Sequence, residues 1–310
     1  ACNGVFSFGS GQGVGADNTG LGYEALASLN GSGGVKNTAV GSQSLGGGQV
    51  SGANNTALGY RSGFNASSGG NNTFIGFESG SNVTTGTFNT AIGNDALKSE
   101  DAGGRNTAIG GYALTSLNGS VVGFNTSIGY ESGLLVSNGV QNTFLGGYAG
   151  NSVTTGDNNT IIGYDADASS ATVDNEITLG NSSVTALRCA VTSITSLSDE
   201  RDKTEIKDLE YGLAFIDALQ PREFVWNNRA ELTKEYDEEG NETEVEFYSS
   251  NKGKKDFGFI AQEVQELDND TLRLVYSENE DKLELSYGKL VPILVKAIQE
   301  LKEEVELLKS

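Results

Sequence analysis

The chain has 310 residues, with no His, no Met and a formal net charge of −21. Without His, a Ser-His-Asp triad, a Cys-His nucleophile pair and a His-ligated zinc site are all excluded. Catalysis by this chain therefore has to use Ser, Lys, Asp, Glu or Tyr. The strong acidity also argues against nucleic acid and anionic membrane surfaces as partners, because both would repel the chain.

Composition also sets expectations for membranes, cofactors and processing. No stretch approaches the roughly 18 apolar residues of a membrane span, so no membrane partner is expected. The chain does not begin with Met, from which we expect a fragment or processed product of something longer. Cys2 and Cys189 lie at opposite ends of a repeat region and are interpreted as incidental thiols. We expect neither a cofactor nor a bound metal.

A motif of the form Asn-Thr-x-apolar-Gly recurs every 17 to 19 residues through the first half of the chain. Its asparagines are Asn18, Asn37, Asn55, Asn72, Asn89, Asn106, Asn125, Asn142 and Asn159. The apolar residue before each Gly forms a column that we predict to be the core: Leu21, Val40, Leu58, Ile75, Ile92, Ile109, Ile128, Leu145 and Ile162. Asn and Gly suit turns that need a positive φ, whereas Thr and β-branched residues suit the strands between them.

Such short units cannot bury an apolar face alone, but stacking them at a fixed period buries a continuous stripe. The pattern therefore predicts a β-roll or β-helix. Because each unit has few large apolar residues, we expect three chains to share the core. The fold predicted for residues 1–180 is thus a glycine-rich, mostly β-repeat shaft of a trimer.

A longer period overlies the short one. Eight consecutive units carry, at equivalent positions, Leu26, Leu45, Gly63, Gly80, Leu97, Leu114, Gly133 and Gly150. Pairs of Leu thus alternate with pairs of Gly, and Phe74 matches Phe144 seventy positions later. We interpret four repeats as the unit of duplication.

The composition changes after the last repeat, near Gly180. We predict a connecting strand over residues 181–197 and a separate, charge-rich α+β domain over residues 198–310. Within that domain we expect a helix at 209–221, a strand at 222–228, a charged hairpin turning near Gly240 and Asn241, a strand running into a helix at 256–267, and a second hairpin at 272–287.

The chain is predicted to end in a long amphipathic helix. Its apolar residues alternate at spacings of four and three: Tyr287, Val291, Leu294, Ile298, Leu301, Val305 and Leu308. This seam predicts self-association. β-Branched residues at the a-type positions and Leu at the d-type positions favour dimers in parallel coiled coils, whereas the shaft argues for a trimer. A seam of about three heptads is too short to set the oligomeric state, and we retain the trimer.

Four segments in order carry a family resemblance: SDERDKTEI at 198–206, LQPREFVWN at 219–227, GFIAQEVQE at 258–266 and YGKLVPILVKAIQELKEEVELL at 287–308. They resemble the intramolecular chaperone auto-processing domain that ends phage tailspikes such as endosialidases, many phage tail fibres and the myelin regulatory factors. The repeats before it look like the head repeats of trimeric autotransporter adhesins.

The resemblance implies that the domain trimerises, aligns the three upstream chains so that the β-helix can form, and is then released by self-cleavage. It places the cleavage at the Ser of a Ser-Asp motif, assisted by a Lys five residues further on. In this chain these residues are Ser198, Asp199 and Lys203, with Leu197 before the site.

A Ser-Lys pair can cut an amide bond when the amine is neutral and takes the Ser proton. A solvated Lys, with a pKa near 10.4, is protonated at neutral pH, so Lys203 would need desolvation or a nearby cation such as Arg201 or Lys207. Attack on the carbonyl of Leu197 is the step we expect, although the sequence leaves open whether the bond cut lies before or after Ser198. The structural alternative is a Ser198 that caps a turn and a Lys203 that is a solvated surface charge.

The sequence thus predicts the distal part of a trimeric viral tail fibre, located on the virion and cut by its own Ser-Lys endopeptidase. The expected partners are two further copies of the chain and a glycan or protein receptor on a host surface, with no nucleic acid and no membrane. The alternative is a trimeric cell-surface adhesin on the extracellular surface, with a retained trimerisation tip. A glycan depolymerase would need paired carboxylates in a large catalytic domain, which the repeats lack.

Overall fold

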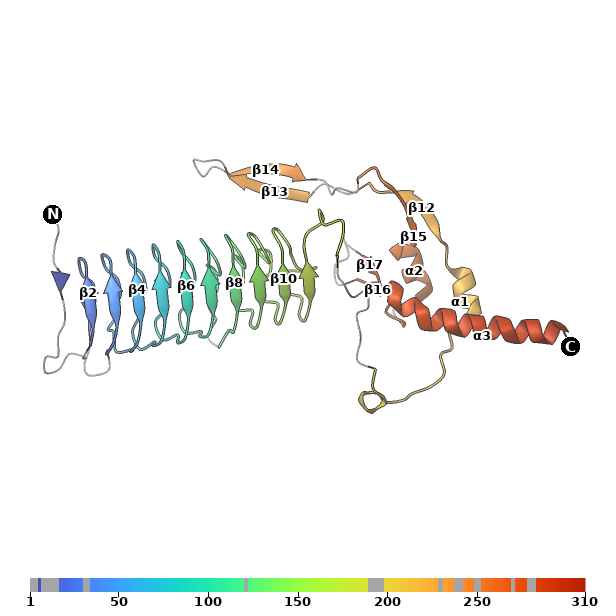
Figure 1. Ribbon diagram of the computed structural model, residues 1–310, viewed down its shortest axis with the longest axis horizontal. Coiled ribbons are helices and arrows are strands. Elements are labelled where there is room, and N and C mark those ends of the chain that lie inside the picture. Colours follow the sequence, from blue (N-terminus) through green and yellow to red (C-terminus); the bar gives the residue numbers. More distant parts are fainter. Residues whose placement is uncertain are drawn as a thin grey trace. The chain divides into compact units, whose positions relative to one another are not determined.

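The computed structural model describes residues 17–29, 34–119, 122–188, 198–227, 252–268, 271–277 and 283–309, together with the backbone of three further strands, Val5–Phe6, Glu231–Tyr236 and Glu242–Phe247. The chain divides into two compact units, Ala1–Asn181 and Ser182–Ser310 (Figure 1). Three residues named above, Cys2, Cys189 and Leu197, lie outside the described residues. So does most of the predicted connecting strand, and the boundaries at 181 and 198 stay predictions.

The first unit is a β-solenoid in which each repeat contributes one three-residue strand to a single sheet. Figure 1 shows the strands lying side by side in chain order. The strands are β2 (Thr19–Leu21), β3 (Thr38–Val40), β4 (Thr56–Leu58), β5 (Thr73–Ile75), β6 (Thr90–Ile92), β7 (Thr107–Ile109), β8 (Thr126–Ile128), β9 (Thr143–Leu145), β10 (Thr160–Ile162) and β11 (Ile177–Leu179). All of these pair in parallel and in register, so that Thr lies over Thr from β2 to β10, and β1 (Val5–Phe6) pairs antiparallel with β2. The predicted β-helix is confirmed.

The core of the solenoid is not the predicted column. The middle residue of each strand is the buried one, as Ala57, Phe74 and Ile161 show, whereas Leu58 and Leu145 in the predicted column are 47% and 45% exposed. Successive side chains of a strand point to opposite faces, so one of the two columns has to face outward. The turns close over the middle residue, whether it is Ala as in β4 or Phe as in β5. The prediction was therefore wrong by one residue for the core of a single chain.

The four-repeat period follows from the sizes of the strand and turn side chains in this core, which complement each other. Phe74 fills the space next to Gly63 and Gly80, where an added Cβ would lie 2.6 Å and 2.2 Å from its ring. The same relation holds for Phe144 with Gly133 and Gly150. Where the middle residue is Ala, as at Ala91 and Ala108, the neighbouring positions carry Leu97 and Leu114, both fully buried. A large ring in the strand thus requires Gly in the turn, because the interior is close-packed.

The motif asparagines form a buried ladder. In each turn the Asn side-chain oxygen accepts the backbone N–H of the residue at the same position in the next turn, as Asn142 does from Asn159 at 2.9 Å. Its amide nitrogen donates to a backbone carbonyl, as Asn142 does to Gly156 at 2.7 Å, except at Asn106, whose amide nitrogen has no partner among the described residues. These Asn residues do not have a positive φ, which is found instead at the residue before each of them and at the motif Gly. The expected role of Gly in the turn is confirmed, and that of Asn was wrong. Asn is required because a buried polar backbone needs a donor and an acceptor at that point.

The second unit is the predicted α+β arrangement. A short turn, η1 (Glu200–Asp202), precedes helix α1 (Leu213–Ala218), and the antiparallel pairs are β12 (Arg222–Val225) with β15 (Lys255–Gly258), β13 (Glu231–Tyr236) with β14 (Glu242–Phe247), and β16 (Val275–Tyr276) with β17 (Glu284–Leu285). Helix α2 (Ala261–Asp268) follows β15, and the turn η2 (Tyr287–Lys289) leads into α3 (Leu290–Lys309). The predicted helices, hairpins and final long helix are confirmed.

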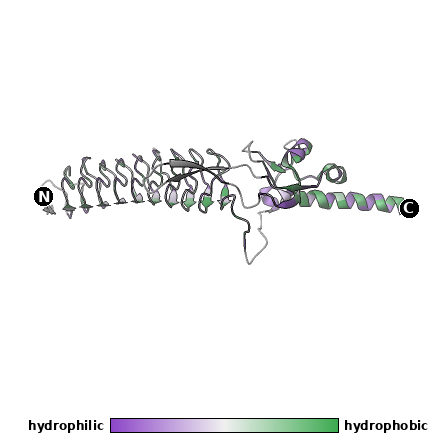
Figure 2. Cartoon of the chain, turned by 90° about the horizontal axis from the view of Figure 1, so that it is seen from above, coloured by the Kyte–Doolittle hydropathy of each residue, from purple (hydrophilic) through white to green (hydrophobic). Residues whose placement is uncertain are grey.

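Helix α3 has two apolar stripes with different surroundings. Leu290, Ile293 and Ala297 are buried in the core of this unit with Phe215 of α1. The seam residues predicted from the sequence lie on another face and are exposed, Ile298 to 66%. Apolar and polar residues alternate along this helix in Figure 2. Within the described residues, no helix is long and apolar enough to cross a membrane.

Candidate functional site

Ser198 and Lys203 lie in contact across the turn η1. The Lys203 Nζ donates to the Ser198 Oγ at 2.7 Å and to the Ser198 backbone carbonyl at 3.1 Å. The N-cap residue Asp199 and the three residues of η1 lie between them, and this turn brings the two side chains together within one chain. Both side chains are exposed.

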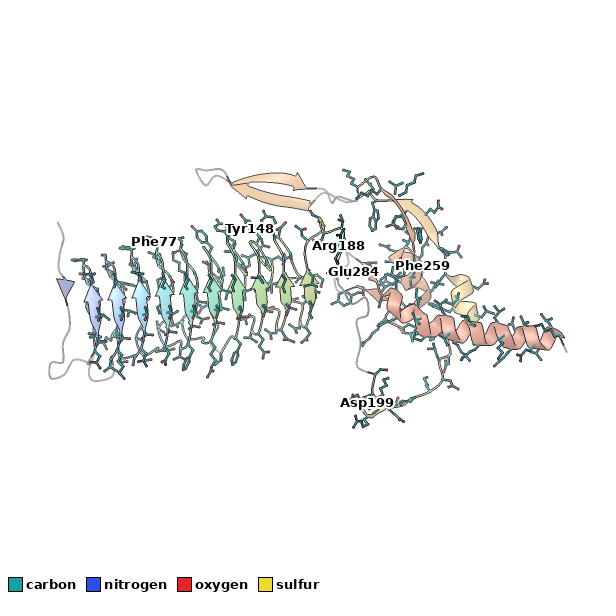
Figure 3. The ribbon with its side chains drawn as sticks, viewed as in Figure 1. Phe77, Tyr148, Arg188, Asp199, Phe259 and Glu284 are labelled. Atoms are coloured by element: carbon teal, nitrogen blue, oxygen red, sulfur yellow. The ribbon has the colours of Figure 1, made fainter. Side chains whose placement is uncertain are left out.

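Asp199 shapes this turn. It is the N-cap of η1 and its carboxylate accepts the backbone N–H of Arg201 at 2.9 Å, which is the capping contact that short polar residues make (Figure 3). The Arg201 guanidinium binds the same carboxylate through Nε at 3.0 Å and Nη2 at 2.6 Å. These contacts, the guanidinium first, lower the pKa of Asp199. Asp199 is therefore an ionised positioning group for the turn that carries Ser198 and Lys203.

The two cations suggested as neighbours of Lys203 have other partners. Arg201 is bound to Asp199, and the Lys207 Nζ lies 3.6 Å from Glu210. Desolvation is the remaining route to a neutral amine, because removing water penalises the charged form.

Three of the four segments that carried the resemblance are joined by side-chain contacts. Arg222, from the second segment, forms two hydrogen bonds to Glu263 of the third, at 3.1 Å and 2.8 Å. The backbone N–H of Phe259, in the third, donates to the Tyr287 hydroxyl of the fourth at 3.2 Å. These residues hold β12, α2 and the start of α3 together. The sequence did not predict these pairs.

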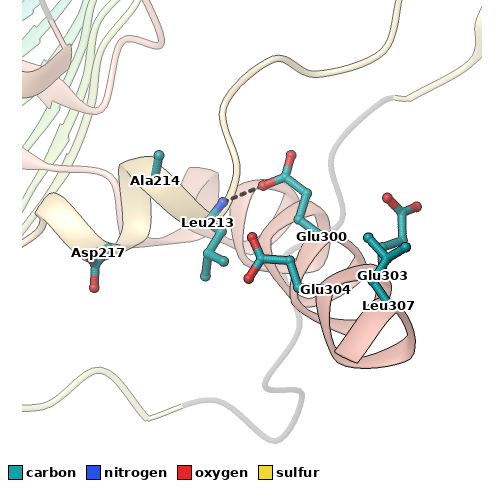
Figure 4. A pocket seen from close by; sticks show the side chains of 7 residues that line it. All are labelled: Leu213, Ala214, Asp217, Glu300, Glu303, Glu304 and Leu307. Atoms are coloured by element: carbon teal, nitrogen blue, oxygen red, sulfur yellow. Dashed lines mark hydrogen bonds between the residues drawn. The ribbon is translucent and has the colours of Figure 1, made fainter. Parts of the chain in front are cut away.

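A groove of about 610 Å³ lies between α1 and α3 (Figure 4). Its lining residues are Leu213, Ala214, Asp217, Glu300, Glu303, Glu304 and Leu307. The Glu300 carboxylate accepts the backbone N–H of Leu213 at 2.7 Å, which supplies the cap that Gly212 cannot. Sequence reasoning missed this role of Glu300, because the two residues are 87 positions apart. The lining includes neither Ser nor Lys, so the groove carries no nucleophile and base pair.

Fold and site together define a class: a β-solenoid shaft whose C-terminal unit carries a Ser-Lys contact at its start. Residues 198–273 match the family model described as the chaperone of endosialidase, so this segment is similar to that chaperone domain and the suspected resemblance is confirmed. No curated protein and no solved structure matches the chain. The combination of this domain with a preceding β-solenoid fits a phage-type tail fibre or tailspike with a C-terminal chaperone.

Proposed function

We propose that the chain is the distal part of a trimeric, phage-type tail fibre on the virion, and that its C-terminal domain directs assembly and then releases itself by cutting at Ser198. The observation that carries the proposal is the 2.7 Å contact between the Lys203 Nζ and the Ser198 Oγ. It lies at the first residue of the segment that is similar to the chaperone domain. The Ser198 hydroxyl is the nucleophile and Lys203 is the base.

Trimerisation is supported by apolar surface that a single chain leaves exposed. In α3 the seam residues Val291, Ile298 and Leu301 are 58%, 66% and 48% exposed, although the neighbouring stripe of the same helix is buried against α1. A helix that is apolar on two faces needs a second partner. Two further copies of α3 provide it.

The shaft offers a second exposed stripe. The outward column that begins at Leu21 and continues through Leu58 to Ile162 places aliphatic side chains at the same register on successive strands. Monomeric soluble proteins rarely leave so long an apolar stripe in water. Packing three such columns against one another would bury it, which gives the chaperone domain its task of aligning the chains.

The proposed cleavage uses only groups of this chain and water. The Ser198 Oγ attacks the carbonyl carbon of Leu197 while the neutral Lys203 amine takes the hydroxyl proton. The C–N bond breaks as Lys203 returns the proton to the Ser198 nitrogen, leaving an ester between Leu197 and the Ser198 oxygen. Water then hydrolyses the ester to a Leu197 carboxylate and a free Ser198 hydroxyl.

Assembly supplies the condition for this step. In the single chain both Ser198 and Lys203 are exposed, and the ammonium form of a solvated Lys donates to the hydroxyl instead of accepting its proton. Closing the trimer removes water from the pair and favours the neutral amine. Cleavage therefore follows correct assembly and reports it.

Intact mass of freshly expressed chain tests the proposal. Wild-type chain should give two products divided at Ser198, while Ser198→Ala and Lys203→Arg stay whole and trimeric, because each lacks one member of the pair. Lys207→Arg is the matched control and should be cut normally. An uncut wild type that is a well-folded trimer would contradict the self-cleavage. It would favour instead a surface adhesin with a retained trimerisation tip.

A further inference from the structure

One column of the solenoid turns changes its residue types in three successive turns. The residue directly before each of the nine motif asparagines, and Asn175 before Glu176 at the equivalent place in the next turn, has a positive φ between 52° and 64°. Seven of these positions carry polar residues: Asp17, Lys36, Asn54, Asn71, Gln141, Asn158 and Asn175. The other three are Phe88, Arg105 and Phe124, which we call the clamp. Bulky side chains at a positive φ also occur at other positions of these turns, as Tyr112 and Leu114 show, but within this column Phe is found only on the two sides of Arg105.

The clamp is a cation held between two aromatic rings. The Arg105 Cζ lies over the Phe88 ring at 5.6 Å and over the Phe124 ring at 5.4 Å from the centroids. Neighbouring rungs of a parallel sheet are about 4.8 Å apart, so the three residues occupy three successive rungs with Arg105 in the middle. Both rings are 54% exposed.

Stability of the turn does not account for this arrangement. Elsewhere in the same column, amide side chains bond directly from rung to rung, from Asn54 to Asn71 at 3.2 Å and from Asn158 to Asn175 at 2.8 Å. Asn also tolerates a positive φ better than Phe does. An Asn column would satisfy the turn with less strain and without apolar surface in water.

The charge of Arg105 is available to a ligand. In a chain with a net charge of −21, Arg105 makes no ion pair with any carboxylate among the described residues. Arg105 is exposed, so the N–H edge of its guanidinium can meet a ligand from solution. That edge binds a carboxylate through two parallel hydrogen bonds, and the neighbouring rings reduce competition from water.

We infer that the clamp is a binding site for a carboxylate-bearing sugar of the hexuronic acid type. The sugar carboxylate binds the edge of Arg105, and the apolar C–H faces of the sugar rings lie on Phe88 and Phe124. Three side chains are far too small a surface for a stable protein interface of about 800 Å² on each partner, which favours a saccharide. Three clamps in one fibre would bind a polymeric glycan with enhanced avidity. The inference rests on the proposed role of the chain as a surface-attaching trimer.

The test uses the full chain carrying Ser198→Ala, titrated with a tetrasaccharide that contains glucuronic acid and, in parallel, with the neutral tetrasaccharide that has glucose in its place. The acidic sugar should bind and the neutral one should bind at least tenfold more weakly. Arg105→Gln and the double variant Phe88→Asn/Phe124→Asn introduce residue types already found in this column, so they should fold. Each should reduce affinity at least tenfold, whereas Lys36→Gln, the control at the other cation of the column, should not.

Three results would overturn the inference: no binding of the acidic sugar, equal binding of both sugars, or unchanged binding by Arg105→Gln. If a short acidic peptide binds as tightly as the acidic tetrasaccharide, the assignment of the ligand as a sugar is wrong. If Phe88→Asn/Phe124→Asn dissociates the trimer, measured by native mass, the clamp is an interchain contact and not a receptor site. Self-cleavage, scored by intact mass in the same variants with Ser198 restored, separates failure of this site from failure of the proposed function.

Discussion

The two units of the chain bury their apolar residues in different ways. In the solenoid, the middle residue of each strand from β2 to β10 and each motif Asn are buried, so one chain closes a continuous core along its length. In the second unit the core is confined to a cluster around Phe215, Leu274 and Ile293, and larger apolar side chains such as Phe257 stay exposed. Under the proposed function, the local geometry of the shaft needs only one chain, whereas the second unit needs partner chains to cover its exposed apolar residues.

We expect the largest effect from changing the exposed apolar seam residues of α3. Ile298→Glu together with Leu301→Glu places charge on the exposed stripe and leaves Leu290, Ile293 and Ala297 untouched. We expect the trimer to be lost and cleavage at Ser198 with it, because the buried charges would be unpaired. Native mass and intact mass measure both effects. Lys302→Ala, an exposed change elsewhere on α3, is the control, and a stable trimer in the double variant would contradict the comparison.

Within the shaft, Phe74→Ala should cost about 3 to 5 kcal/mol of unfolding free energy, because it opens a cavity beside Gly63 and Gly80. Denaturant unfolding of an uncleavable chain measures this. Adding Gly63→Leu and Gly80→Leu should restore part of the loss, since Leu97 and Leu114 adopt the same positive φ beside Ala91 and Ala108. If the Leu residues make the Phe74→Ala variant still less stable, the idea that strand and turn side chains complement each other in size is wrong.

Among the described residues of the shaft that are at most 1% exposed, Glu100 is the one acidic side chain, and it occupies the position at which other turns have Val83 or Val136. Burial raises its pKa to about 7, while backbone N–H groups, among them Gly103 at 2.6 Å, act in the opposite direction. The folded state therefore binds more protons than the unfolded state between pH 4.5 and about 7. Stability should fall as the pH rises through that window, by about 3 kcal/mol from this group.

Glu100→Gln removes this titration. The unfolding free energy of wild type and variant should be measured at pH 5 and at pH 8. Other carboxylates contribute equally to both chains, so the difference between the chains reports Glu100. The wild type should lose about 3 kcal/mol more than the variant over this range. An identical pH dependence of the two chains would show that Glu100 is not the group responsible.

The smallest effect is expected at the Arg222 and Glu263 pair in the second unit. Their side chains are 48% and 39% exposed, and exposed ion pairs contribute at most about 1 kcal/mol. Arg222→Ala should therefore lower stability by less than 1 kcal/mol and leave assembly intact. Thermal unfolding of the trimer measures this, with Arg222→Lys as the conservative control. A loss of several kcal/mol would mean that the pair is buried in the assembly.

Much of the architecture followed from repetition in the sequence. A motif with a constant Asn and Gly at a near-constant period predicted parallel strands in register, because each turn repeats the same backbone requirements. The elements of the second unit were predicted from apolar periodicity and from Pro and Gly at their ends. The family resemblance suggested that Ser198 and Lys203 act together. No pattern along the chain, however, predicts that a three-residue turn joins them.

The sequence by itself determined the β-solenoid, the element types of the second unit and the segment that is similar to the chaperone of endosialidase. Only the tertiary structure decided which strand column is buried, because alternation specifies two faces and not which face the turns close over. It also decided the partners of Asn142, Glu300 and Arg105, which lie in space next to residues distant in the chain. Such pairs depend on how turns stack, a property that no local window of sequence contains.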